Sequence, residues 1–150
     1  MIFQSLVVST ILDMQRTKQI YPIRLIERSI LSSKNCFAPA MKSNGFMTNS
    51  DYSILEKIYD SVLNSKDAFP NKIIYLRCKP ETCLERIKMR NRSEEDGISI
   101  EYLNQLHKLH EDWLMTGNAG VPVTVIECEQ DWPELSKEYN LRKDEILLCN

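Results

Sequence analysis

Short apolar runs, separated by longer segments of helical periodicity, constrain the fold of this chain most strongly. Three such runs occur, at 23–26, 72–77 and 122–128. Between them, apolar residues recur every three or four positions, as they do on one face of an amphipathic helix. Strands that alternate with helices form parallel sheets, because the connection between parallel strands has to cross over the sheet. The sequence therefore predicts an α/β domain with a parallel sheet and flanking helices.

Capping residues and helix breakers set the expected bounds of the helices. Asn44-Gly45 should end a helix, because glycine readily adopts the left-handed conformation that follows a last turn. Pro80 suits a first turn, whereas Pro39 inside a predicted helix should kink it or shift its start. Asn49-Ser50 is a suitable N-cap. The expected helices are 2 to about 17, 30–43, 51–65, 80–90, 99–115 and 133–148.

The tripeptide Glu27-Arg28-Ser29 directly follows the first apolar run. An acid, a base and a hydroxyl would then lie at the carboxyl end of a buried strand. Open α/β sheets bind their ligands at this edge. These residues are therefore candidates for handling a phosphate or a sugar hydroxyl.

Three arginines form the second candidate cluster. Arg86 and Arg90 are four residues apart and share a helix face, and Arg92 follows in a polar loop. Two interpretations fit this pattern. Charged runs near a helix C-terminus are commonly solvated faces that the helix dipole favours. Alternatively, the guanidinium groups belong to a lid that closes over a polyphosphate, which arginine binds through forked donors.

Composition excludes several classes of partner. The net charge of −2 argues against a nucleic-acid-binding domain, because such domains are usually basic. The sequence holds no run of 18 apolar residues, so no membrane span is expected. Its five cysteines form no C-x-x-C pair, which favours a reduced, intracellular protein. The first ten residues show no signal-peptide pattern. At 150 residues, a single domain is expected.

Several motifs, in order and spacing, resemble the deoxynucleoside kinase family, and within it the mitochondrial thymidine kinases and the broad-specificity insect enzymes. The resemblance runs from about residue 1 to residue 127. The motifs that carry it are Phe3-Gln4-Ser5, Glu27-Arg28-Ser29-Ile30 with Cys36-Phe37, Ile74-Tyr75-Leu76-Arg77 with Pro80-Glu81, Arg90-x-Arg92-Ser93-Glu94-Glu95, and Glu101-Tyr102-Leu103 with the segment 106–114.

The resemblance implies transfer of the γ-phosphate of ATP to the 5′-hydroxyl of a deoxynucleoside, in nucleotide salvage. It implies that Gln4 pairs with the edge of the nucleobase, for which an amide offers a donor and an acceptor. It places Phe37 against the face of the base and Arg28 near the 5′-oxygen. It assigns Glu27 to Mg²⁺ and Glu95 to the sugar 3′-hydroxyl.

The same resemblance assigns Arg86, Arg90 and Arg92 to an ATP lid that neutralises the moving phosphoryl group. The resemblance also bears on which nucleobase is accepted. Ile11 and Ser33 align with an arginine and an aspartate that flank the base in deoxycytidine and deoxyguanosine kinases. An apolar and a small residue resemble the pyrimidine-accepting branch. Thymidine and deoxycytidine are therefore the expected substrates.

No phosphate loop is present in the sequence. None of its four glycines lies in a G-x-x-x-x-G-K-[ST] motif. The resemblance implies that the first two strands of the P-loop-kinase-type sheet, with the catalytic base, lie upstream of Met1. Residues 1–150 would then be the carboxyl-terminal two-thirds of a single, N-terminally truncated kinase domain, inactive alone.

Two explanations of this pattern stay open. The chain is a fragment of a normal kinase, or it is a short product that binds nucleosides or dimerises without catalysis. The family dimerises through helices that match 30–43 and 99–115, so a homodimer is expected from either. The compartment is expected to be mitochondrial or cytoplasmic.

Overall fold

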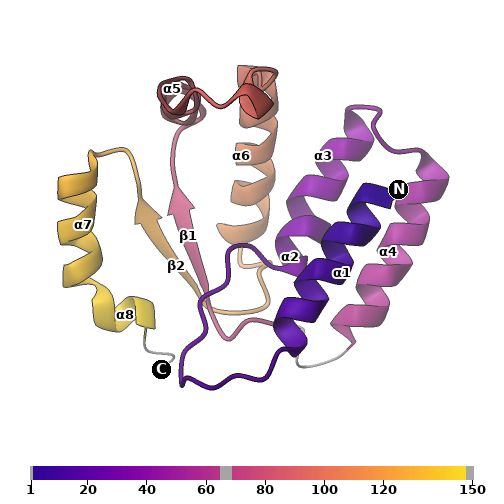
Figure 1. Cartoon of the computed structure of the whole chain (residues 1–150), viewed down its shortest axis with the longest axis horizontal. Helices are drawn as coiled ribbons and strands as arrows, with labels where there is room; N and C mark the ends of the chain where they lie inside the picture. The colour runs from indigo at the N-terminus through magenta and orange to yellow at the C-terminus, as the bar shows by residue number, and fades with distance from the viewer. Residues whose placement is uncertain (1, 65–68, 148–150) are drawn as a thin grey trace. The chain divides into compact units, whose positions relative to one another are not determined.

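The computed structural model describes the backbone of residues 2–64 and 69–147, and the side chains of these residues except 2–5, 15 and 16. The chain divides into two compact units, 1–70 and 71–150, and each is described by itself. Helices and a two-stranded parallel sheet are both present (Figure 1). The predicted α/β class with flanking helices is therefore confirmed.

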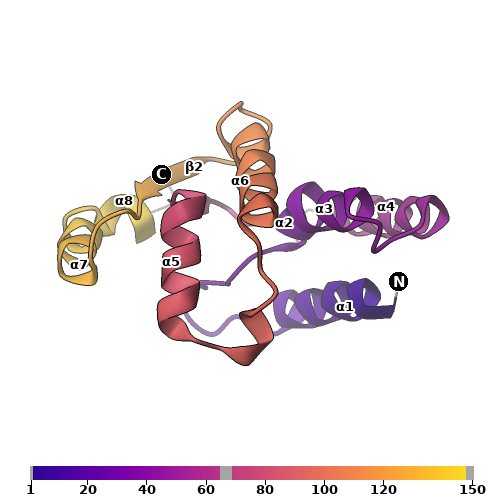
Figure 2. The same cartoon turned by 90° about the horizontal axis from the view of Figure 1, so that it is seen from above.

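The first unit is helical in its described part. α3 and α4 lie side by side and α1 lies over them, as Figures 1 and 2 show. A buried apolar cluster joins these helices. The elements are α1 (Ile2–Arg16), α2 (Ile30–Ser32), η1 (Ser33–Phe37), α3 (Ala38–Ser43) and α4 (Asn49–Leu63). The cluster consists of Val8, Ile11, Ile30, Ala38, Met47, Leu55 and Tyr59.

The predicted helix at 30–43 forms as three consecutive elements with a wide turn in the middle. In η1, a π-helical turn, the N–H of Ala38 donates to the carbonyl of Ser33, five residues back. Pro39 follows at once; it has no N–H, and its ring crowds the carbonyl four residues back. The wider turn before Pro39 is the disturbance that the sequence led us to expect. The helix then ends at Asn44, and Gly45 follows with φ +76°, as predicted.

α4 begins two residues earlier than predicted, and its N-cap is Thr48. The hydroxyl Oγ1 of Thr48 accepts a hydrogen bond from the N–H of Asp51 at 3.1 Å and donates one to Oδ2 of Asp51 at 2.9 Å. The prediction that Asn49-Ser50 forms the cap was wrong. Thr48 reaches the third N–H of the helix, which is the position a capping hydroxyl serves.

The predicted strand at 23–26 does not form. Ile23 and Leu25 are 44% and 74% exposed. Arg24 instead holds this segment, because its guanidinium donates to the carbonyls of Met14 and Thr17 at the end of α1. A strand needs a neighbour to satisfy its N–H and C=O groups. Among residues 2–64 no strand lies beside this segment, so its apolar side chains stay at the surface.

The second unit holds the parallel pair β1 (Ile73–Arg77) and β2 (Val123–Glu127), in register from Ile73 opposite Val123 to Arg77 opposite Glu127. Both strands were predicted, within one residue at each end. Between them lie α5 (Pro80–Arg90), η3 (Ser93–Glu95) and α6 (Ile100–Leu114), and after them α7 (Trp132–Leu141) and α8 (Lys143–Leu147). In Figure 1, α6 lies to one side of the strands and α7 and α8 to the other.

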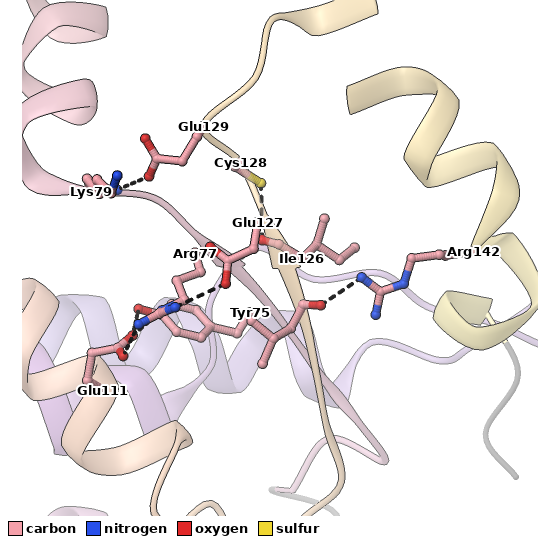
Figure 3. Close-up of polar contacts among 10 residues, drawn as sticks. Tyr75, Arg77, Lys79, Glu111, Ile126, Glu127, Cys128, Glu129 and Arg142 are labelled. Atoms are coloured by element: carbon pink, nitrogen blue, oxygen red, sulfur yellow. Dashed lines mark hydrogen bonds and ion pairs between the residues drawn. The ribbon is translucent and has the colours of Figure 1, made fainter. Parts of the chain in front are cut away.

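The predicted single helix 133–148 is two helices that break at Arg142. The guanidinium of Arg142 donates to the carbonyl of Val125 in β2 at 2.8 Å, as Figure 3 shows, and to both oxygens of Glu145 at 2.8 and 2.9 Å. Glu138 accepts a further bond at 3.3 Å. The break lets the Arg142 side chain reach the strand. Apolar periodicity and capping patterns in the sequence do not predict such a contact. No helix in the described residues is long and apolar enough to cross a bilayer.

Candidate functional site

The tripeptide Glu27-Arg28-Ser29 forms the entry to α2. Ser29 is the N-cap, and its N–H donates to Oγ of Ser32 at 3.1 Å while that hydroxyl donates back to the Ser29 carbonyl at 2.7 Å. Arg28 has φ +62°, in the left-handed region. Such a conformation costs a residue with a Cβ about 1–3 kcal/mol and tends to occur at functional sites. The backbone thus turns sharply at Arg28.

The turn brings Arg28 to Phe37. Its guanidinium carbon lies 4.6 Å from the centroid of the Phe37 ring, a cation–π contact. Arg28 is exposed and Phe37 is half-buried. The two residues that the resemblance assigned to the 5′-oxygen and to the base therefore lie against each other, one before α2 and one at the end of η1.

Ser33 and Ile11, the two residues assigned to base preference, are buried. Ile11 belongs to the apolar cluster of the first unit, together with Ile30 and Tyr59. The Ser33 hydroxyl shares a 2.8 Å hydrogen bond with the hydroxyl of Tyr59. Burial raises the pKa of Tyr59, with the Ser33 bond acting in the opposite direction, so the phenol is neutral at physiological pH.

In the sequence, Tyr59 falls four residues after Leu55 on the apolar face of a predicted helix. A tyrosine in such a row signals a buried hydroxyl that needs a partner. Its partner Ser33 lies 26 residues away, and the sequence did not indicate which polar residue would meet it.

For Gln4 the structure gives only the backbone position, and for Glu27 it gives an exposed side chain. Gln4 lies in α1, but its side chain falls outside the described residues. Glu27 is exposed. Within residues 2–64 and 69–147, no three His, Cys, Asp or Glu side chains converge on a possible metal site. Mg²⁺ often takes only one or two protein carboxylates and completes its shell with phosphates and water. The Mg²⁺ role of Glu27 stays a prediction.

In the second unit, Arg90, Arg92 and Glu95 form an ion-paired group, which we call the arginine triad. Arg90 donates from Nε to Oε2 of Glu95 at 3.0 Å, and from Nη2 to Oε1 and Oε2 at 2.8 Å each. Nη1 of Arg92 lies 3.9 Å from Oε1 of Glu95. Asn91, with φ +50°, ends α5 and reverses the chain, so Glu95 on η3 meets Arg90.

Arg86 lies on the same helix but binds elsewhere. Its Nη1 donates to the carbonyl of Cys128 at 2.7 Å, and its Nη2 to that of Gln130 at 3.1 Å. These carbonyls belong to the loop that follows β2, 42 and 44 residues along the chain. The structure therefore brings Arg90, Arg92 and Glu95 together and places the Arg86 guanidinium on a separate backbone contact.

Glu129, in the same loop, caps α5. Its carboxylate accepts a hydrogen bond from the N–H of Lys79 (Figure 3). It also accepts one from the hydroxyl of Thr82 at 2.7 Å. The Thr82 bond contributes most to lowering the pKa of Glu129. The role of Glu129 has no local signal in the sequence, because its partner Thr82 lies 47 residues away.

Arg77 lies at the end of β1, between two carboxylates (Figure 3). Its Nε and Nη2 donate to Glu111 of α6 at 3.0 and 2.8 Å, and its Nη1 donates to Glu127 of β2 at 3.1 Å. The hydroxyl of Tyr75 donates to the same Glu111 carboxylate at 2.9 Å. This network ties α6 to both strands.

The stability of the chain should fall in acid partly through Glu111. The Arg77 hydrogen bonds, before any other cause, hold the pKa of Glu111 below its ordinary 4.5. A carboxyl with a lowered folded-state pKa stabilises the fold fully above its unfolded pKa and loses that contribution as pH falls through the folded pKa. We expect the difference in unfolding free energy between wild type and Arg77→Gln to be largest near neutral pH and to shrink below about pH 4.5.

Urea denaturation at a series of pH values measures this difference. Lys88→Gln removes an exposed cation from α5 in the same unit and serves as the control, with an effect that is flat across this pH range. A constant difference between wild type and Arg77→Gln down to pH 3 would contradict the role given to Glu111.

The sequence is similar to known proteins over almost its whole length. The family model described as "Deoxynucleoside kinase" matches residues 1–146. The chain is 37% identical over 147 residues to "Thymidine kinase 2, mitochondrial" of Homo sapiens, covering 96% of the chain and 56% of that protein. It is 32% identical over 138 residues to "Deoxycytidine kinase 2" of Gallus gallus, covering 84% and 51%. It is 38% identical over 123 residues to "Deoxycytidine kinase" of Homo sapiens, covering 75% and 47%. The chain thus spans about half the length of these relatives.

Proposed function

Because the chain belongs to the deoxynucleoside kinase family, we propose that it supplies the nucleoside-binding and arginine-rich parts of a site for ATP-dependent 5′-phosphorylation of deoxynucleosides. The contact between Arg28 and Phe37 carries the proposal. A ring that can stack on a base lies beside a cation that can face the sugar 5′-oxygen, and the cation, Arg28, sits on the left-handed turn before α2.

On this proposal, Phe37 stacks on the nucleobase and Gln4 pairs with the base edge. Arg28 faces the 5′-oxygen and Glu95 accepts the sugar 3′-hydroxyl. Glu27 contributes one carboxylate to Mg²⁺. Each role suits the chemistry of the residue: aromatic faces stack on bases, amides pair with their edges, and carboxylates accept from hydroxyls.

We assign phosphate binding to Arg90 and Arg92, whose side chains are 47% and 62% exposed. Forked guanidinium donors stabilise the charge that a moving phosphoryl group carries. Arg86 would join them in a lid only by leaving the carbonyls of Cys128 and Gln130. We therefore propose that Arg86 holds α5 in position through these bonds and turns toward phosphate only when the lid closes over ATP.

A pyrimidine is the proposed base. Ile11 offers no polar atom, and the Ser33 hydroxyl is already bonded to Tyr59. Neither residue supplies the charged donor or acceptor that the family resemblance places beside the base in deoxycytidine and deoxyguanosine kinases. Thymidine is the first candidate and deoxycytidine the second.

A non-catalytic module is the second candidate function. The sequence has no phosphate-loop motif, so no backbone cradle for the donor phosphates is present in these 150 residues. Such a module would bind nucleosides or form a homodimer through the helices at 30–43 and 99–115 without phosphoryl transfer. We propose a mitochondrial or cytoplasmic location, since one relative carries a mitochondrial name.

Two measurements on the purified 150-residue chain test these proposals. We expect thymidine to raise the melting temperature more than deoxyguanosine does, and we expect no thymidine monophosphate from thymidine, ATP and Mg²⁺. Stronger stabilisation by deoxyguanosine would contradict the pyrimidine preference, and no stabilisation by any deoxynucleoside would contradict the site. Sustained turnover would refute both the inactivity of the chain alone and the non-catalytic alternative.

A further inference from the structure

We propose that Glu95 is an internal competitor for the anion-binding arginines and keeps Arg90 from phosphate until Glu95 itself is drawn away. The proposal rests on the proposed function in one respect, the assignment of Arg90 and Arg92 to phosphate. It adds a role to Glu95 that the family resemblance does not assign.

The geometry of the arginine triad carries this inference. Three hydrogen bonds of 2.8–3.0 Å occupy the edge of Arg90 formed by Nε and Nη2. That edge is the fork through which a guanidinium binds a carboxylate or a phosphate in a bidentate manner. Oε1 of Glu95 also lies 3.9 Å from Nη1 of Arg92. A phosphate that used the same edge of Arg90 would therefore have to displace Glu95.

The backbone holds the competitor in place. Glu95 ends η3, where its N–H donates to the Arg92 carbonyl at 2.9 Å and its carbonyl accepts from the N–H of Ile98 at 3.0 Å. Its side chain is 19% exposed, less than those of Arg90 and Arg92. The carboxylate is thus presented to Arg90 at a high effective concentration.

The contact is nevertheless weak enough to exchange. Arg90 is 47% exposed, so water and salt screen its ion pair with Glu95 from the arginine side and limit its strength. A pair of this kind lowers the affinity of a competing anion by about fivefold when its geometry is bidentate. On the proposed function, a nucleoside whose 3′-hydroxyl draws Glu95 away from Arg90 would free this fork, so phosphate access would follow nucleoside binding.

Glu94 provides a matched control. It is adjacent to Glu95 and carries the same charge, but its side chain is exposed and accepts a long contact of 3.4 Å from the hydroxyl of Ser93. Glu94→Gln and Glu95→Gln change the net charge equally. Any difference between them therefore reports the contact with Arg90 and not the overall charge.

The test is isothermal titration of the 150-residue chain with inorganic tripolyphosphate, in the absence of nucleoside and Mg²⁺. We expect Glu95→Gln to bind tripolyphosphate about fivefold more tightly than Glu94→Gln. In an Arg90→Gln background the two substitutions should give the same affinity, because the guanidinium for which Glu95 and phosphate compete is absent. Glu95→Ala is a second removal and should show the same gain. Circular dichroism checks that each variant keeps its helices.

Equal affinities of Glu95→Gln and Glu94→Gln would overturn the inference and leave the phosphate role of Arg90 standing, provided that Arg90→Gln weakens binding. A gain that persists in the Arg90→Gln background would also overturn it. If Glu95→Gln binds no tripolyphosphate, or if Arg90→Gln changes nothing in any background, the phosphate assignment in the proposed function fails as well.

Discussion

Replacement of Leu55 with alanine is expected to lower the free energy of unfolding by about 2–5 kcal/mol. Leu55 is 1% exposed on α4 and packs in the cluster that includes Ile30, Ala38 and Tyr59. The substitution removes apolar contact and leaves a cavity between helices that relax only partly. Denaturation in urea, followed by circular dichroism, measures the loss.

Ile54 is the control for this prediction. It precedes Leu55 on the same helix but is 46% exposed. Ile54→Ala removes a side chain of the same volume and should cost within about 1 kcal/mol, in the range of surface changes. Equal losses for the two variants would mean that α4 does not bury the face seen here. The helix at 30–43, which carries Ser33 and Phe37, would then lack its support.

Phe37→Ala is expected to weaken thymidine binding by about 1–3 kcal/mol, or roughly fivefold to 150-fold. Phe37 is half-buried, and the guanidinium of Arg28 lies 4.6 Å from its ring centroid. Without the ring, the base loses its stacking surface and Arg28 loses the contact that orients it. Titration calorimetry with thymidine, on a variant shown to be folded, gives the affinity.

Two substitutions separate stacking from bulk. Phe37→Leu keeps an apolar side chain without an aromatic face and should lose most of the same affinity. Phe46 is a second phenylalanine of the first unit, 75% exposed and without an assigned role, so Phe46→Ala should bind thymidine as wild type does. Unchanged affinity in Phe37→Ala would exclude this ring from the nucleoside site.

Local patterns predicted the elements whose signals are contained in a few neighbouring residues. The helix from Pro80 ends at Arg90, and Ser99 caps α6 by accepting from the N–H of Tyr102. Proline in a first turn, a hydroxyl at a cap and apolar residues at helical spacing are short-range features. The strands β1 and β2 were predicted for the same reason, from short segments rich in β-branched and other apolar residues between breakers.

The segment 23–26 shows where such reasoning fails. Its apolar residues have the composition of a buried strand, and an apolar run records only that burial would be favourable. A strand forms only when a neighbour pairs with its backbone, and no described residue of the first unit does so. The prediction of a single helix at 133–148 was wrong for a related reason, because the carbonyl that Arg142 binds lies on β2.

For the candidate site, the sequence alone determined which chemistry is available: an aromatic ring, an amide, carboxylates and arginines at the spacing of the deoxynucleoside kinases. Only the tertiary structure decided how these groups are used. It set Arg28 against Phe37, bonded Ser33 to Tyr59, and divided the arginines so that Arg86 holds backbone carbonyls while Arg90 holds Glu95. The physical reason is that a hydrogen bond depends on distance and direction in space. Where the partner lies far along the chain or beyond a chain reversal, residue types and their spacing do not reveal it.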